Sequence, residues 1–190
     1  MGHAGTLDPS ATGVLIVLCG DATRRTDEFM SLPKEYVARI RFGFTTSTDD
    51  FEGEVTESKP VDNWPLDKIV AALKSCLGAV PQVPPAVSAV KISGQRSYQM
   101  ARAGRETTLK PRVVYIHELR LLSEARPEIT VLIRCSRGTY VRALARDLGE
   151  QLGWGGTLAA LARTAVGPYR NDHALTLHDI FLRRSEFSGN

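Results

Sequence analysis

GHAGTLDPSATG, residues 2–13, is the stretch that the rest of this chain is organised around. It brings His3, Asp8 and Pro9 together with three glycines and runs into the apolar segment Val14–Cys19. Glycines make such a loop costly to order, and Pro9 keeps Asp8 out of the helical region, so the carboxylate lies on a stiff, extended turn. A costly polar loop attached to a rigid strand is a common place for chemistry. The alternative from spacing alone is an ordinary Asp-Pro turn or cap.

Length and composition indicate an ordinary soluble globular protein with one domain. The chain has 190 residues, of which 43% are hydrophobic and 24% charged. The strongly apolar run Val14–Cys19 is too short to span a bilayer and lacks the flanks of a signal peptide. Cys19, Cys76 and Cys135 are odd in number and lack zinc spacing, which predicts reduced thiols in or near the core and a cytoplasmic protein.

The small net charge of +3 is unevenly distributed. Residues 91–112 hold 6 of the 24 basic residues and 1 of the 21 acidic ones, which leaves 18 basic and 20 acidic residues elsewhere. Most of the basic residues are arginines, which bind phosphate with two donors and stack on bases. With Tyr98 in its midst, this segment is typical of a nucleic-acid contact, and a solvated charged face is the alternative.

Hydrophobic periodicity predicts strands and helices that are interspersed without strict βαβ alternation. This favours an α+β fold with a mixed, largely antiparallel sheet flanked by helices. The strands are predicted at 14–19 (buried on both faces), 35–42 (alternating), 86–92, 113–122 and 128–135. The helices are predicted at 21–30 (capped by Asp21), 65–77, 97–103, 141–152 and 177–182 (capped by Thr176).

Residues 49–54 form an acidic cluster without the ligand pattern of an EF-hand, so we expect no metal site there. Arg142 begins the predicted helix 141–152, where free N–H groups and the helix dipole favour an anion. Arg142 and Arg146 are expected on the polar side, and a plain surface arginine is the alternative. One stiff carboxylate and one arginine suggest nucleophilic chemistry on a glycosidic bond. The lack of an obvious second acid disfavours an ordinary glycosidase.

The opening stretch, with Val14 and Leu15, resembles the signature of the TruB family, the tRNA pseudouridine-55 synthases. Four further segments resemble that family in the same order along nearly the whole chain. They are Lys34-Glu35-Tyr36, Ser88-Ala89-Val90-Lys91 with Gly94, Tyr98 and Ala101-Arg102, the block from Cys135 to Arg142 with Asp147-Leu148-Gly149, and Leu161-Ala162-Arg163-Thr164.

The resemblance implies a pseudouridine synthase fold and a role for each matching residue. Asp8 would be the nucleophile that attacks the target uridine at C1′ or at C6, and Arg142 would keep it ionised and oriented. Tyr36 would stack on the flipped base and help to remove the C5 proton. Six further residues would bind the substrate. His3 would fill the space left by the flipped nucleotide, and Tyr140 and Leu161 would line the pocket. Asp50 would contact the base or Arg142, and Lys91 and Arg102 would bind RNA.

The resemblance further implies a single catalytic domain over residues 1–190, with a basic insertion at about 81–112 that clamps RNA. The substrate would be uridine 55 in the T-arm of tRNA, flipped out of its stack at a cost of roughly a few kcal/mol. No metal and no organic cofactor are expected, and the protein is expected to act as a monomer away from membranes.

Two departures from the family pattern concern the ends of the chain. The strand that usually precedes the signature and the C-terminal RNA-binding domain, often PUA-like, are both missing from this sequence. A fragment that is inactive for lack of its first strand is therefore one alternative. A non-catalytic RNA-binding or tRNA-chaperone module with the same fold is a second, and an N-glycosylase is a third.

Overall fold

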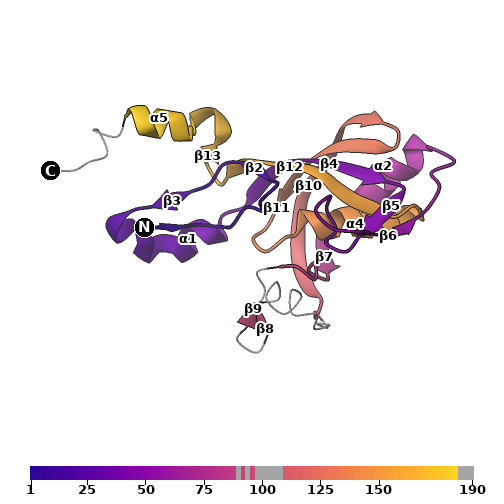
Figure 1. The fold of residues 1–190 in the computed structure, drawn as a ribbon, viewed down its shortest axis with the longest axis horizontal. Helices are drawn as coiled ribbons and strands as arrows, with labels where there is room; N and C mark the ends of the chain where they lie inside the picture. The colour runs from indigo at the N-terminus through magenta and orange to yellow at the C-terminus, as the bar shows by residue number, and fades with distance from the viewer. Residues whose placement is uncertain (89–90, 93–94, 97–108, 184–190) are drawn as a thin grey trace.

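Antiparallel pairing joins six of the described strands into one twisted sheet (Figure 1). The computed structural model describes residues 1–88, 91–92, 95–96 and 109–183. Its strands are β1 (Gly2–His3), β2 (Thr12–Gly13), β3 (Val17–Leu18), β4 (Lys34–Phe42), β5 (Phe44–Thr46), β6 (Val55–Ser58), β7 (Gly78–Gln82), β8 (Lys91–Ile92), β9 (Gln95–Arg96), β10 (Arg112–Ala125), β11 (Glu128–Cys135), β12 (Gly156–Val166) and β13 (Tyr169–Arg170).

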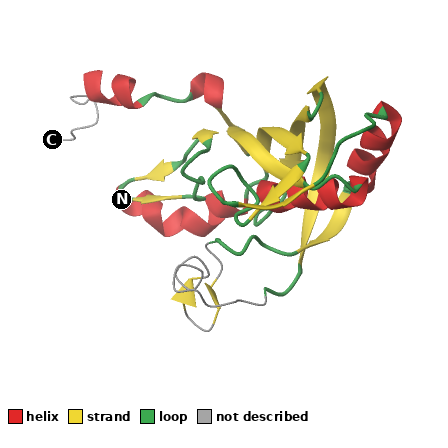
Figure 2. Cartoon of the chain, turned by 45° about the vertical axis from the view of Figure 1, so that its right-hand side comes forward, coloured by secondary structure: helices red, strands yellow, loops and turns green. Residues whose placement is uncertain are grey.

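Helices are interspersed among these strands along the chain, and Figure 2 distinguishes the two by colour. They are η1 (Gly20–Arg25) and η2 (Asn171–His173), which are 3-10 helices, and the α-helices α1 (Thr26–Ser31), α2 (Leu66–Ser75), α4 (Val141–Leu152) and α5 (Leu177–Leu182). The main sheet has the order β13-β12-β4-β11-β10-β7, and β2 adds a short parallel pair to β12. The predicted α+β class with a mixed, largely antiparallel sheet is confirmed.

One face of the sheet is packed and the other is open, as the alternation in β4 dictates. Ala38, Ile40 and Phe42 are at most 1% exposed, whereas Arg39 and Arg41 between them point to the opposite, exposed face. This is the period-2 pattern of an antiparallel strand covered on one side only.

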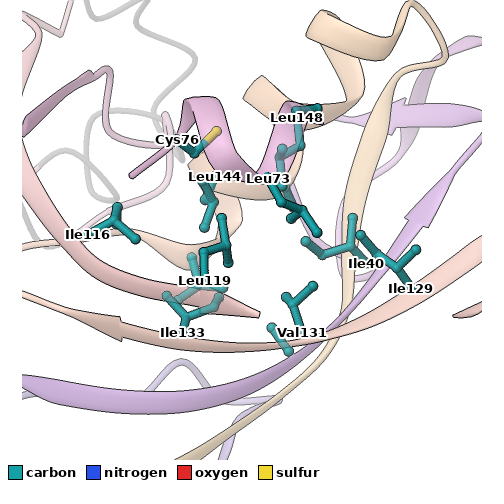
Figure 3. Packing of buried hydrophobic residues seen from close by; sticks show 14 of the residues in the cluster. Ile40, Leu73, Cys76, Ile116, Leu119, Ile129, Val131, Ile133, Leu144 and Leu148 are labelled. Atoms are coloured by element: carbon teal, nitrogen blue, oxygen red, sulfur yellow. The ribbon is translucent and has the colours of Figure 1, made fainter. Parts of the chain in front are cut away.

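Helices α2 and α4 cover the packed face and close the core (Figure 3). Ile69 and Leu73 of α2 and Leu144 and Leu148 of α4 are all nearly fully buried against β4, β10 and β11. Burying one such side chain contributes roughly 1.5–3 kcal/mol to folding. Gly153, with φ 78°, ends α4 in the left-handed conformation typical of a helix C-terminus. The chain then turns directly into β12, which carries part of the site.

Three local expectations are wrong. Residues 14–19 do not form a strand buried on both faces: β3 is short, and Leu15 and Val17 are 44% and 52% exposed. The single helix predicted at 21–30 is divided into η1 and α1, and Asp21 caps neither. An apolar run does not by itself say how many of its faces the fold will cover. Cys19 is exposed, while the other two cysteines are buried as expected.

Other expectations hold or fall outside the described residues. The helix at 177–182 has its predicted Thr176 cap, in a reciprocal capping box with Asp179. Of the strand predicted at 86–92, the described part shows only β8, paired with β9, and the helix predicted at 97–103 lies outside the described residues. Among the described helices, none has the length and apolar character to cross a membrane.

Candidate active site

The loop that carries Asp8 is held at its start by the pairing of β1 with β3 and at its end by the pairing of β2 with β12. Thr12 and Gly13 pair in parallel with Ala162 and Arg163, and the Val14 amide donates to the Arg163 carbonyl at 2.8 Å. Gly13 has φ 105°, and a Cβ there would lie 2.2 Å from the Arg163 carbonyl oxygen. Only glycine permits this close approach.

Arg163 also holds the loop through its side chain, although it is only 1% exposed. Its guanidinium donates to the carbonyl of Val14 at 2.7 Å and to that of Gly5 at 3.0 Å. These bonds supply the partners that a buried cation needs. The stretch 2–13 is thereby held at both ends, with Asp8 between the two attachments. Sequence reasoning missed this role, and the available signal was a lone charge in the apolar strand 158–166.

Arg142 binds Asp8 through two parallel hydrogen bonds. The Nε–Oδ2 distance is 2.9 Å and the Nη2–Oδ1 distance is 3.1 Å. The arginine side chain is 6% exposed, whereas that of Asp8 is 36% exposed. Two parallel charge-assisted bonds fix both the position and the plane of the carboxylate. Arg142 therefore lies on the polar side of α4 as expected, but it is not the surface arginine of the alternative interpretation.

The same guanidinium contacts two further segments. Nη1 donates to the carbonyl of Thr48 at 2.9 Å and lies 3.5 Å from Asp50 Oδ2, and Nη2 donates to the carbonyl of Val87 at 3.0 Å. We call residues 46–50 the acidic turn and residues 83–87 the connector. Arg142 thus joins the Asp8 loop, the acidic turn and the connector at the start of α4.

Asp50 is held by its own turn as well as by Arg142. Its Oδ1 accepts from the Thr48 hydroxyl at 2.5 Å and from the Glu52 amide at 3.1 Å, and its side chain is 8% exposed. Asp8, Asp50 and Leu161 line a common pocket, together with Ser10, Ala11, Phe51, Glu52 and residues 158–160. Three of the predicted site residues therefore face one hollow of the surface, and Ser10 and Ala11 are wall residues that sequence reasoning missed.

Tyr36 lies on β4 opposite Arg163 of β12, half-buried at the margin of the core. Burial raises the pKa of its phenol to about 12; Cys135 and, to a smaller extent, Asp8 add to that rise, and Arg163 opposes it. The phenol is therefore neutral around pH 7. In this state its ring offers an apolar face for stacking.

The remaining predicted site residues are not brought into contact with Asp8 in the part of the chain that the structure describes. Tyr140 is half-buried just before α4, and its backbone exchanges two hydrogen bonds with the side-chain amide of Gln82, at 2.8 and 3.0 Å. His3 is exposed on β1. Lys91 lies on β8 without a described side chain, and Arg102 lies outside the described residues.

Metal binding finds no support in the described residues. They contain no group of three or more His, Cys, Asp or Glu side chains placed to hold an ion. The acidic cluster that raised this alternative is instead engaged by arginines, since Asp49 and Asp50 each lie beside a guanidinium of α4. The chemistry available at the pocket is that of one accessible carboxylate held by one buried arginine.

Two family models divide the chain between them. Residues 1–141 match the model described as TruB family pseudouridylate synthase (N terminal domain), and residues 142–184 match the tRNA pseudouridylate synthase B C-terminal domain. The chain belongs to the TruB family. The resemblance of the five segments is therefore confirmed.

Relatives of the TruB family cover almost all of this chain. The tRNA pseudouridine synthase B of Bacteroides fragilis is 47% identical over 175 residues, which are 92% of this chain and 75% of the relative. Those of Thermobifida fusca and Mycobacterium tuberculosis are also 47% identical, and their alignments cover 95% and 96% of this chain but only 64% and 63% of the relatives.

Solved structures support the same assignment. The chain is similar to one in a Cbf5-Nop10-Gar1 complex, with a TM-score of 0.73 and 27% identity, and to one in an archaeal box H/ACA sRNP Nop10-Cbf5 complex, with a TM-score of 0.67 and 26% identity. The alignments cover 100% and 97% of this chain, and 48% and 46% of those chains. The chain thus spans less than half the length of these structural relatives.

Proposed function

We propose that this chain isomerises uridine to pseudouridine in tRNA, at position 55 of the T-arm, with Asp8 as the nucleophile. The observation that carries the proposal is the paired hydrogen bonding of Arg142 to a carboxylate that is still 36% exposed at a pocket. Family membership and relatives named tRNA pseudouridine synthase B support it. A carboxylate held ionised and open on one side is suited to nucleophilic attack.

The proposed reaction rearranges bonds without adding or losing atoms. In one route Asp8 attacks C1′ and the N1–C1′ bond breaks, with its electron pair leaving on the uracil. The ring turns, C5 bonds to C1′, and the carboxylate leaves. In the other route Asp8 adds to C6, the N1–C1′ bond breaks, C5 bonds to C1′, and the carboxylate is then eliminated from C6. Both routes end when the C5 proton is lost and N1 gains a proton, so no cofactor is needed.

The other side chains would serve the flipped nucleotide. Tyr36 would stack on the base and assist loss of the C5 proton, while Tyr140 and Leu161 would line the pocket. His3, exposed on β1, would fill the space that the nucleotide leaves. Since the Tyr36 phenol is neutral at physiological pH, its oxygen would act as a relay rather than as a standing base.

RNA binding would fall to the basic insertion at 81–112, including Lys91 and Arg102. Its six basic residues against one acidic residue suit a folded RNA backbone, read by shape and phosphate. We further propose that residues 1–190 act as one catalytic domain and as a monomer, and that the tRNA substrate is met in the cytoplasm. Measuring the molar mass by light scattering, with and without RNA, would test whether the chain is a monomer.

A T-arm stem-loop carrying tritium at C5 of its target uridine tests the proposal. The wild-type chain is expected to release tritium as water and to leave pseudouridine in the RNA. Asp8→Asn should bind the RNA with similar affinity and lower the rate by about 10⁴-fold or more, since it removes the nucleophile. Asp21→Asn removes an exposed carboxylate paired with Arg24 at 3.6 Å, and should react as the wild type does.

Three outcomes would contradict the proposal. Binding without tritium release by the wild-type chain would indicate an RNA-binding module or an inactive fragment. Free uracil in solution would indicate an N-glycosylase. Full activity in Asp8→Asn would mean that another residue is the nucleophile.

A further inference from the structure

A second arginine of α4, Arg146, repeats the contacts of Arg142 one helical turn further on. Its Nη1 lies 2.8 Å from Asp49 Oδ2, and its Nη2 donates to the carbonyl of Val83 at 2.9 Å. Its Nε and Nη2 also bind Asp147 Oδ1, at 3.0 and 2.9 Å. Residues four apart on a helix lie on the same face, which is why the two arginines point toward the same two segments.

The two arginines bind adjacent residues of the acidic turn and opposite ends of the connector. Arg142 contacts Asp50 and the carbonyl of Val87, and Arg146 contacts Asp49 and the carbonyl of Val83. Arg142 alone of this pair extends to Asp8. Arg146 therefore makes the same cross-links as Arg142 without touching the nucleophile.

Asp49 adopts a backbone conformation that needs support. Its φ is 61°, the left-handed region that residues other than glycine rarely occupy, although Asp tolerates it better than most. It also stands between the two Arg142 partners of the acidic turn, the Thr48 carbonyl and the Asp50 carboxylate. A rotation at Asp49 would move both partners at once.

The Asp49 carboxylate is itself partly buried, with 13% of its side chain exposed. Burial raises its pKa, and the charges of Arg146 and then Arg142 oppose that rise. Without Arg146, the poorly solvated Asp49 carboxylate would lose its nearest cation. A movement of the acidic turn that exposed this carboxylate to water would then lower the free energy.

We propose that Arg146 is a positioning residue for the reaction. By holding Asp49 and Val83 it fixes the acidic turn and the connector, and these two segments fix the guanidinium that orients Asp8. The assignment rests on the proposed function. An arginine is required because several donors in one plane reach both partners, whereas a lysine supplies a single charged group.

Single-turnover rates with saturating T-arm stem-loop test this assignment. Arg146→Ala is expected to lower the rate constant about tenfold while RNA affinity stays within about twofold of wild type, because a small misplacement of a reacting group is costly. Arg146→Lys should recover part of the loss, because it keeps the charge beside Asp49. Asp49→Asn should show a similar loss. The double variant Arg146→Ala/Asp49→Asn should lose little more than either single variant, because the two residues act as a pair.

Arg134→Ala is the matched control. Arg134 also joins two carboxylates, Glu35 at 3.7 Å and Glu118 at 3.9 Å, but its side chain is 58% exposed on the open face of the sheet. Every variant is assayed well below its melting temperature, and each rate is normalised to the folded fraction measured by circular dichroism.

Three results would overturn the assignment. The first is a rate for Arg146→Ala equal to that of the control, and the second is a loss that vanishes after normalisation. The third is a double variant whose loss is the product of the two single losses. A wild-type chain that forms no pseudouridine would instead overturn the proposed function, and this assignment with it.

Discussion

Asp8 and Asp50 share one guanidinium, yet their surroundings differ sharply. Asp50 is 8% exposed and accepts hydrogen bonds from Thr48 and Glu52 within its own turn. Asp8 is 36% exposed, and in the described part of the chain its carboxylate accepts side-chain bonds from Arg142 alone. Burial and additional hydrogen bonds hold Asp50 in its turn, whereas Asp8 keeps an exposed side that the proposed substrate could reach.

The contrast distinguishes a carboxylate that positions other groups from one that is available to react. A carboxylate with its lone pairs occupied is a poor nucleophile, because attack would first break those hydrogen bonds. A carboxylate with one well-placed cation is oriented and still available. The arginine is the common element, so changes at Arg142, Asp50 and the surroundings of Asp8 should differ in kind as well as in size.

The largest effect is expected from Arg142→Lys. Lysine keeps the charge but cannot form two parallel bonds to Asp8 while also reaching the Thr48 and Val87 carbonyls. We expect the single-turnover rate to fall by about 100-fold or more, because the plane of the nucleophile is lost. Arg120→Lys, at an arginine that is 61% exposed, is the control. A loss of less than about threefold would mean that charge alone suffices at this position.

A smaller effect is expected from Asp50→Asn. The amide keeps the size of the side chain and an oxygen that can accept from Thr48, so the turn should persist while the ion pair with Arg142 is weakened. The rate should fall about tenfold, in line with a role in orientation. Single-turnover assays beside urea unfolding measure both quantities. If Asp50→Asn were as inactive as Asp8→Asn, the division between anchor and nucleophile would be wrong.

The smallest effect concerns the pKa of Tyr36. Burial is its main cause and the charge of Asp8 a minor one, whereas Asp50 is not among the causes. Ultraviolet titration of the wild type against Tyr36→Phe should assign a phenol that ionises near pH 12. Asp8→Asn should lower that pKa slightly and Asp50→Asn should leave it unchanged. An equal shift from both variants would contradict a specific effect of the Asp8 charge on the Tyr36 phenol.

The same pKa bears on stability with a definite sign. The folded pKa of about 12 lies above the ordinary value of 10, so folding favours the protonated phenol. This stabilisation is complete below pH 10 and is lost as the pH rises through 12. Activity between pH 6 and 9 should accordingly show no step that depends on Tyr36.

Most of the scaffold could be predicted from local patterns. The alternation of β4, the apolar stripes of α2 and α4, and the Thr176 cap each depend on periodicity or capping within one element. The segment 14–19 could not be predicted in this way, because its exposure depends on how few elements the fold packs against it. The pairing of Asp8 with Arg142 was predicted through resemblance to a family, since 134 residues separate the two in sequence.

The pattern of α4 alone left two interpretations of Arg142 open for a physical reason. A helical wheel separates apolar from polar positions, and it correctly places the core residues Leu144 and Leu148. It cannot tell whether the polar side meets water or another polar segment. Here the acidic turn and the connector cover that side, so both arginines of α4 are partly or fully withdrawn from solvent.

The fastening of the Asp8 loop to β12 has a consequence for synthesis on the ribosome. The loop is made well before the strand that holds its end, because Arg163 follows Val14 by 149 residues. Since proteins fold as they emerge, the loop can pair locally through β1 and β3, but it must wait for its attachment to β12. Closing so long a segment of chain costs little more entropy than closing a shorter one, but it delays assembly. Asp8 thus leaves the ribosome long before the strand and the helix that position it, Arg163 on β12 and Arg142 on α4.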